Sequence, residues 1–79
     1  MTFQQIKDQD QQYILHTYGR VDAALVKGQN ARAWDAEGKE YIDFTSGIGV
    51  NALGYADPAW ARAVARQAGE IQQLCNYYY

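Results

Sequence analysis

The chain has 79 residues, which is room for one small domain and excludes a multidomain enzyme within this polypeptide. Its 48% of apolar residues includes 12 alanines and 7 tyrosines, so few large aliphatic side chains remain to build a core. Seven basic and nine acidic residues leave a net charge of −2, without the basic cluster that nucleic-acid binding requires. The composition therefore indicates a small soluble domain with a thin core.

Several kinds of site and segment are also excluded. His16 and Cys75 are the only soft metal ligands and lie far apart in the sequence, so no metal site is expected. No apolar run approaches the roughly 20 residues of a membrane span, and the Gln-rich beginning is unlike a signal peptide. The single cysteine cannot form an internal disulfide and fits a reducing cytoplasm, which is the expected location.

Residues 1–18 are predicted to form an N-terminal helix, a unit of their own. They contain no Gly or Pro before residue 19, and their apolar residues fall loosely at helical spacing. Thr2 and Gln5, three positions apart, make a capping box at the start. The remaining surface is rich in Gln and Asp, so this helix is expected to bury little.

Residues 19–79 are expected to form the second unit, which begins with three short antiparallel strands. The first strand is expected to include the apolar run over 23–26 and to end at Gly28. Alternating patterns follow over 31–34 and 40–44. Between the last two, Asp35-Ala36-Glu37-Gly38 suits a type I turn followed by a residue at positive φ. The pattern predicts a hairpin there.

The rest of the chain is predicted to be a loop and a helix. Residues 45–57 contain three glycines and little periodicity, which is typical of functional or disordered loops. Asp57 and Pro58 suit the cap and first position of a helix, and apolar spacing continues to Cys75. This predicts a long amphipathic helix of about five turns. The fold class predicted is α+β.

No constellation in the chain predicts catalysis on its own. Ser46-Gly47-Ile48-Gly49 contains Gly-x-Gly but lacks a third glycine and an adjoining helix, so a flexible turn is favoured over a phosphate cradle. Glycines there would also let a substrate approach the backbone. His16, the only histidine, is not placed to act as a base for Thr45 or Ser46.

Other polar and aromatic residues receive structural interpretations. The acidic residues of the hairpin are interpreted as solvated surface rather than acid–base pairs. They are Asp35, Glu37, Glu40 and Asp43. Trp34 and Trp60 are interpreted as core anchors. Tyr18 is either a packing residue or a ligand contact, and periodicity does not separate the two.

Four motifs, in order, resemble the amino-terminal segment of the class III pyridoxal-phosphate aminotransferases. They are Tyr18-Gly19-Arg20, the stretch from Trp34-Asp35 to Asp43-Phe44, the stretch from Ser46-Gly47 to Leu53-Gly54, and Asn76-Tyr77-Tyr78. The last two resemble the acetylornithine branch of that class. Tyr55-Ala56-Asp57-Pro58 departs from the His-x-His-Pro that the family typically has there.

The resemblance implies a fold-type I enzyme several times longer than this chain. The lysine, aspartate, phosphate loop and arginine of that family's active site are expected beyond Tyr79, and the aromatic end of the chain also indicates an interrupted polypeptide. No catalytic or cofactor-binding residue is therefore expected here, and the fragment is expected to be inactive and to hold no cofactor. Pyridoxal phosphate, a small amino-acid substrate and a homodimer are implied for the full-length enzyme.

The residues implied to face the substrate are Tyr18, Ser46, Gly47 and Ile48. Related ornithine enzymes have a tyrosine at the position of Ile48, so an aliphatic residue there favours an acylated substrate. The implied reaction is transamination between N-acetylornithine and 2-oxoglutarate in arginine biosynthesis. The alternatives are another class III transaminase, acting on ornithine, succinylornithine or 4-aminobutyrate, and a free-standing interaction module that uses Trp60 and the terminal tyrosines.

Overall fold

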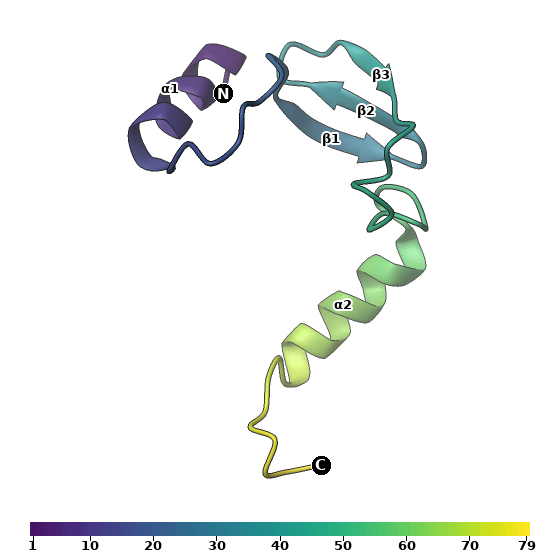
Figure 1. The fold of residues 1–79 in the computed structure, drawn as a ribbon. Coiled ribbons are helices and arrows are strands. Elements are labelled where there is room, and N and C mark those ends of the chain that lie inside the picture. Colours follow the sequence, from purple (N-terminus) through teal and green to yellow (C-terminus); the bar gives the residue numbers. More distant parts are fainter.

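The computed structural model describes all 79 residues, and it contains two helices and a three-stranded sheet (Figure 1). The elements are α1 (Phe3–Tyr13), β1 (Leu25–Gln29), β2 (Arg32–Asp35), β3 (Glu40–Ile42) and α2 (Pro58–Glu70). The strands follow the spatial order β1-β2-β3, and both pairs are antiparallel. The predicted succession of helix, antiparallel sheet, loop and helix is confirmed.

α1 begins where the sequence predicts and ends earlier. The Thr2 hydroxyl accepts from the Gln5 backbone N–H at 3.2 Å, and the Gln5 side chain accepts from the Thr2 N–H at 2.9 Å, which confirms the capping box. The prediction of a helix through residue 18 is wrong, because Ile14 is already extended. Residues 14–18 are all exposed, so no buried face favours further helical turns.

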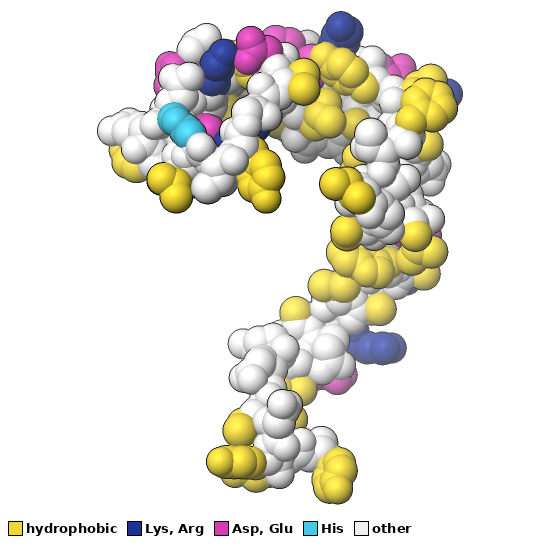
Figure 2. Space-filling view, viewed as in Figure 1, with side chains coloured by type: hydrophobic (Ala, Val, Ile, Leu, Met, Phe, Trp, Pro, Cys, Tyr) yellow, Lys and Arg dark blue, Asp and Glu magenta, His cyan; other side chains and the backbone are white.

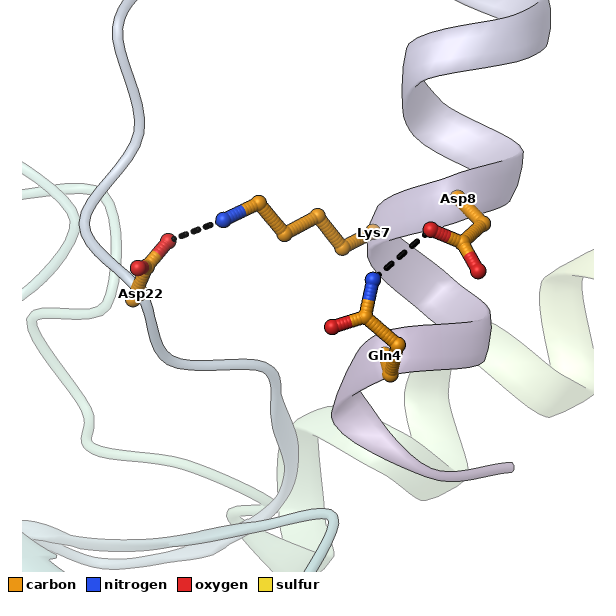
Figure 3. A network of polar contacts seen from close by, with 4 residues as sticks. All are labelled: Gln4, Lys7, Asp8 and Asp22. Carbon is orange, nitrogen blue, oxygen red and sulfur yellow. Dashed lines mark hydrogen bonds and ion pairs between the residues drawn. The ribbon is translucent and has the colours of Figure 1, made fainter.

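Two ion pairs hold the segment after α1 against the helix. Lys7 Nζ lies 2.9 Å from an Asp22 carboxylate oxygen, and Arg20 lies 3.1 Å from Asp10. Figure 3 shows the first of these joining the helix to the loop that carries Asp22. Because these pairs join residues 7 and 10 of the helix to residues 22 and 20, the chain has to reverse direction soon after Tyr13.

The hairpin between β2 and β3 has the predicted turn. The Gly38 N–H donates to the Asp35 carbonyl at 3.0 Å, and Gly38 has a φ of +87°. The prediction that Gly28 ends the first strand is wrong: β1 continues to Gln29, and Gly28 pairs with Ala33. The strand continues through its pairing with β2, and Gly28 leaves room on one face for the ring of Tyr55.

α2 also begins as predicted and is shorter than predicted. Asp57 Oδ2 accepts from the Trp60 N–H at 2.9 Å, and Pro58 is the first helical residue. The expected extension to Cys75 is wrong, because the helix stops at Glu70 and Ile71 is extended. The Gln67 side chain donates to the Ile71 carbonyl at 2.7 Å and closes the last turn.

The molecule is open, with almost no core. Its radius of gyration is 16.3 Å, against roughly 12 Å for a compact domain of this length. α2 projects away from the sheet (Figure 1), and hydrophobic side chains are exposed along it and near the C-terminus (Figure 2). Ala33 is the only buried residue. Trp34 is half-buried, but Trp60 is 58% exposed, so its interpretation as a core anchor is wrong for this structure.

Neither helix combines the length and the apolar character that a membrane crossing requires.

Candidate functional site

The loop that follows β3 contains an unusual run of left-handed backbone. Ser46, Gly47, Ile48 and Gly49 have φ values of 53°, 57°, 59° and 88°. Glycine adopts this conformation readily, but each residue with a side chain loses roughly 1–2 kcal/mol there, and a β-branched residue such as Ile48 is a true outlier. The surrounding structure therefore has to hold the loop in place.

Asp43 holds the base of this loop. Its Oδ1 accepts from the Thr45 N–H at 2.7 Å, from the Ser46 N–H at 3.0 Å and from the Thr45 hydroxyl at 2.9 Å. The Thr45 N–H and then the Ser46 N–H are the main reasons that the pKa of the Asp43 carboxyl falls from 3.8 to about 2. The nearby Tyr55 hydroxyl favours the carboxylate further, and the carboxylate in turn raises the pKa of Tyr55.

Tyr55 ties the far end of the loop to the sheet. Its backbone exchanges two hydrogen bonds with Asn30, of 2.8 and 3.0 Å, and forms an isolated antiparallel bridge. Its ring packs on Gly28, where a Cβ atom would lie only 2.4 Å from Tyr55 Cγ. Gly54, at φ 79°, passes the Asn30 backbone so closely that a Cβ there would lie 3.1 Å from Asn30 Cα. The loop is thus fixed at its base by Asp43 and at its far end by contacts that need Gly28 and Gly54.

The predicted substrate-facing residues lie in two places. Ser46 is half-buried at the base of the loop, whereas Gly47 is exposed and Ile48 is 98% exposed. Tyr18 is 78% exposed and belongs to the segment opposite α1. The structure brings Ser46, Gly47 and Ile48 together in one turn, and it places Tyr18 in a separate cavity. Substrate contact by these four residues stays a prediction.

That cavity has a volume of about 460 Å³ and lies between α1 and residues 16–24. Phe3 and Ile6 supply part of its apolar lining, and its charged lining residues already pair with one another as Lys7 with Asp22 and Arg20 with Asp10. None of residues 45–49 lines it.

The interpretation of the four acidic hairpin residues as solvated surface holds for Glu37 and Glu40, which are exposed, but not fully for Asp35 and Asp43. Asp35 and Asp43 are half-buried acceptors for backbone amides rather than solvated surface. Glu37 accepts from the Phe3 N–H at 2.8 Å, and Glu40 pairs with Arg32 at 3.0 Å. Asp43 does carry a local signal, because Asp side chains commonly accept a hydrogen bond from the backbone N–H two residues further on. Tyr55 and Gly28 gave no such local signal.

Acidification should release the base of the loop. Because the folded pKa of Asp43 is lowered to about 2, its contribution to stability is complete above its ordinary pKa of 3.8 and is lost as pH falls through about 2. In a pH titration by ¹H–¹⁵N NMR, the Thr45 and Ser46 amide resonances should shift with a midpoint near that lower value. Asp43→Asn should remove the transition, and a midpoint at the ordinary value of 3.8 in the unsubstituted chain would contradict the expectation.

The lysines of this chain do not fit as holders of pyridoxal phosphate, the cofactor that the resemblance implies. Such a lysine needs a free amine in an enclosed pocket. Lys7 is paired with Asp22, Lys27 Nζ lies 5.2 Å from the centre of the Trp34 ring, and Lys39 Nζ lies 5.1 Å from that of Tyr41. With Ala33 the only buried residue, nothing here encloses a cofactor.

Comparison with known proteins gives one family. Residues 13–78 match the family model described as aminotransferase class-III. The acetylornithine aminotransferase of Haemophilus ducreyi is 49% identical over all 79 residues, which are 20% of its own length. That of Streptomyces coelicolor is 42% identical over 78 residues, or 99% of this chain and 19% of the relative.

Solved structures agree. The acetylornithine aminotransferase of Elizabethkingia anophelis superposes with a TM-score of 0.94 at 24% identity, over 100% of this chain and 21% of that one. The ornithine aminotransferase of Toxoplasma gondii gives 0.91 at 31% identity, over 99% of this chain and 18% of that one. The chain therefore spans about a fifth of the length of the proteins it matches.

Proposed function

The chain belongs to the class III aminotransferases, and from this membership we propose that it is the amino-terminal part of a pyridoxal-phosphate-dependent transaminase acting on N-acetylornithine and 2-oxoglutarate. The observation that carries the proposal is the 49% identity to an acetylornithine aminotransferase over every residue of the chain. In the proposed enzyme the catalytic lysine and the cofactor site lie in the remaining four-fifths of the fold-type I protein.

Within that enzyme, we assign Tyr18, Ser46, Gly47 and Ile48 to the side of the pocket that receives the amino donor. Two features support this assignment. Ile48 stands at the tip of a strained turn, 98% exposed, so its side chain is free to contact another part of the protein or a ligand. It is also aliphatic, which suits the neutral acyl end of N-acetylornithine better than the ammonium group of ornithine.

The finer parts of the proposal follow from the same family. The enzyme is proposed to be a cytoplasmic homodimer in arginine biosynthesis, in which residues 1–18 and 19–79 form two pieces of one partial domain. The exposed apolar residues of α2 are then buried by the rest of the enzyme. Ornithine aminotransferases are also among the structural matches, so ornithine is the competing amino donor.

A hybrid enzyme tests the proposal. In it, residues 1–79 replace the matching fifth of the Haemophilus ducreyi acetylornithine aminotransferase. We expect the hybrid to transaminate N-acetylornithine with 2-oxoglutarate, and to prefer it to ornithine, succinylornithine and 4-aminobutyrate in kcat/KM. The 79-residue chain alone should show no activity when pyridoxal phosphate is added.

Two results would count against the proposal. A folded hybrid without transaminase activity contradicts it, and a hybrid that prefers ornithine moves the assignment to that donor. The matched control is the relative's own enzyme, prepared in the same way. If the isolated chain instead sediments as one monodisperse species with strong amide protection, the interaction module is the better explanation.

A further inference from the structure

Asp43 connects the end of β3 to the left-handed loop. It lies one residue past Ile42, the last residue of that strand, and a single oxygen of its carboxylate takes all three hydrogen bonds from Thr45 and Ser46. The hydrogen bonds inside the loop, from Ile48 to Thr45 and from Asn51 to Ser46, do not reach the sheet. Asp43 is therefore the side chain that fixes the loop's first residues relative to β3.

The loop needs such a restraint because its conformation is unfavourable for two of its residues. Ser46 and Ile48 both have φ values above 50°. If Asp43 released Thr45 and Ser46, the backbone at Ser46 and Ile48 would relax toward negative φ. The turn would then present a different side to the surroundings. The direction in which Ile48 points thus depends on a contact that Ile48 itself does not make.

We propose that Asp43 is a positioning residue for the amino donor: it holds Thr45 and Ser46 so that the left-handed turn presents Ile48 to the substrate. The inference rests on the proposed function and adds a residue to it that makes no contact with the donor. Its carboxylate oxygen is already occupied by three donors from the loop.

The chain contains a matched control in Asp35. One of its oxygens also accepts from two backbone amides just ahead in the chain, Glu37 at 3.0 Å and Lys39 at 2.8 Å. A tyrosine, Tyr41, donates to its other oxygen at 3.0 Å. Asp35 therefore does the same structural work as Asp43 in the hairpin turn, which carries none of the proposed substrate-facing residues.

The test compares Asp43→Ala, Asp43→Asn and Asp35→Ala in the hybrid enzyme. We expect Asp43→Ala to raise the KM for N-acetylornithine about tenfold while kcat changes much less, as the loss of charge-assisted hydrogen bonds would do. Asp43→Asn should recover part of the loss, since its amide oxygen still accepts from Thr45 and Ser46. Asp35→Ala should leave the KM unchanged, because a loss of folded enzyme lowers the maximal rate and not the KM.

Amide exchange, measured by mass spectrometry on the same hybrids, follows the loop without relying on activity. Exchange at Thr45 and Ser46 should speed up in Asp43→Ala, and only exchange at Glu37 and Lys39 should speed up in Asp35→Ala. If the hybrid is active and both alanine variants change the KM equally, the positioning role of Asp43 is overturned while the proposed function stands. An inactive unsubstituted hybrid contradicts the proposed function, and unchanged exchange at Thr45 and Ser46 then overturns this inference as well.

Discussion

Replacing Gly28 with alanine is expected to break the connection between the sheet and the candidate loop. The new Cβ would lie 2.4 Å from Tyr55 Cγ and 2.6 Å from Tyr55 Cβ, and these atoms are too close to the backbone to swing aside. The Tyr55 backbone is itself held by its two hydrogen bonds to Asn30. The methyl group must therefore displace Tyr55 from β1, and such overpacking costs about 1–3 kcal/mol.

Amide exchange in the hybrid enzyme measures this cost directly. A loss of about 1–3 kcal/mol corresponds to exchange roughly 5- to 150-fold faster at the Asn30 and Tyr55 amides. Gly69→Ala is the control, because Gly69 lies in α2 with nothing within 4 Å of the added atom. Gly28→Ala with unchanged protection at both amides would show that Tyr55 is not clamped as the structure has it.

The features that the sequence predicts correctly are those that depend on neighbouring residues. The Thr2 and Asp57 caps and the Gly38 turn each rest on residues within three or four positions of one another, so their hydrogen bonds can be expected from spacing alone. The ends of α1 and α2 were predicted too late because periodicity continues past Tyr13 and Glu70, although no other element is there to bury the apolar face.

The site was only partly predictable for a related reason. Spacing and resemblance indicate the loop around Ser46 and Ile48, and Asp43 at its start is a local turn signal, but none of these predicts that the backbone is left-handed. The contact between Gly28 and Tyr55 joins residues far apart in sequence, and neither residue has a local pattern that requires the other. Long-range contacts of this kind are set by how the strand and loop meet in space.

Replacing Ile48 with tyrosine is expected to change which donor the enzyme prefers. Ile48 is 98% exposed in this chain, so a larger side chain displaces none of its neighbours here. The phenol hydroxyl can accept a hydrogen bond from the side-chain ammonium of ornithine, for which an aliphatic residue offers no partner. The ratio of kcat/KM for N-acetylornithine to that for ornithine should therefore fall by about tenfold or more in the hybrid enzyme.

Two further variants separate the hydroxyl from the bulk of the ring. Ile48→Phe adds a ring without the hydroxyl, so it should lower the rate with both donors and leave their ratio closer to that of the unsubstituted hybrid. Val50→Tyr places the same phenol two residues along, at a position that is 84% exposed but outside the left-handed run, and should not shift the ratio. If Val50→Tyr shifts it as much as Ile48→Tyr, donor choice does not depend on the tip of this turn. A shift confined to Ile48→Tyr would instead show that donor choice depends on the side chain that this left-handed turn carries at position 48.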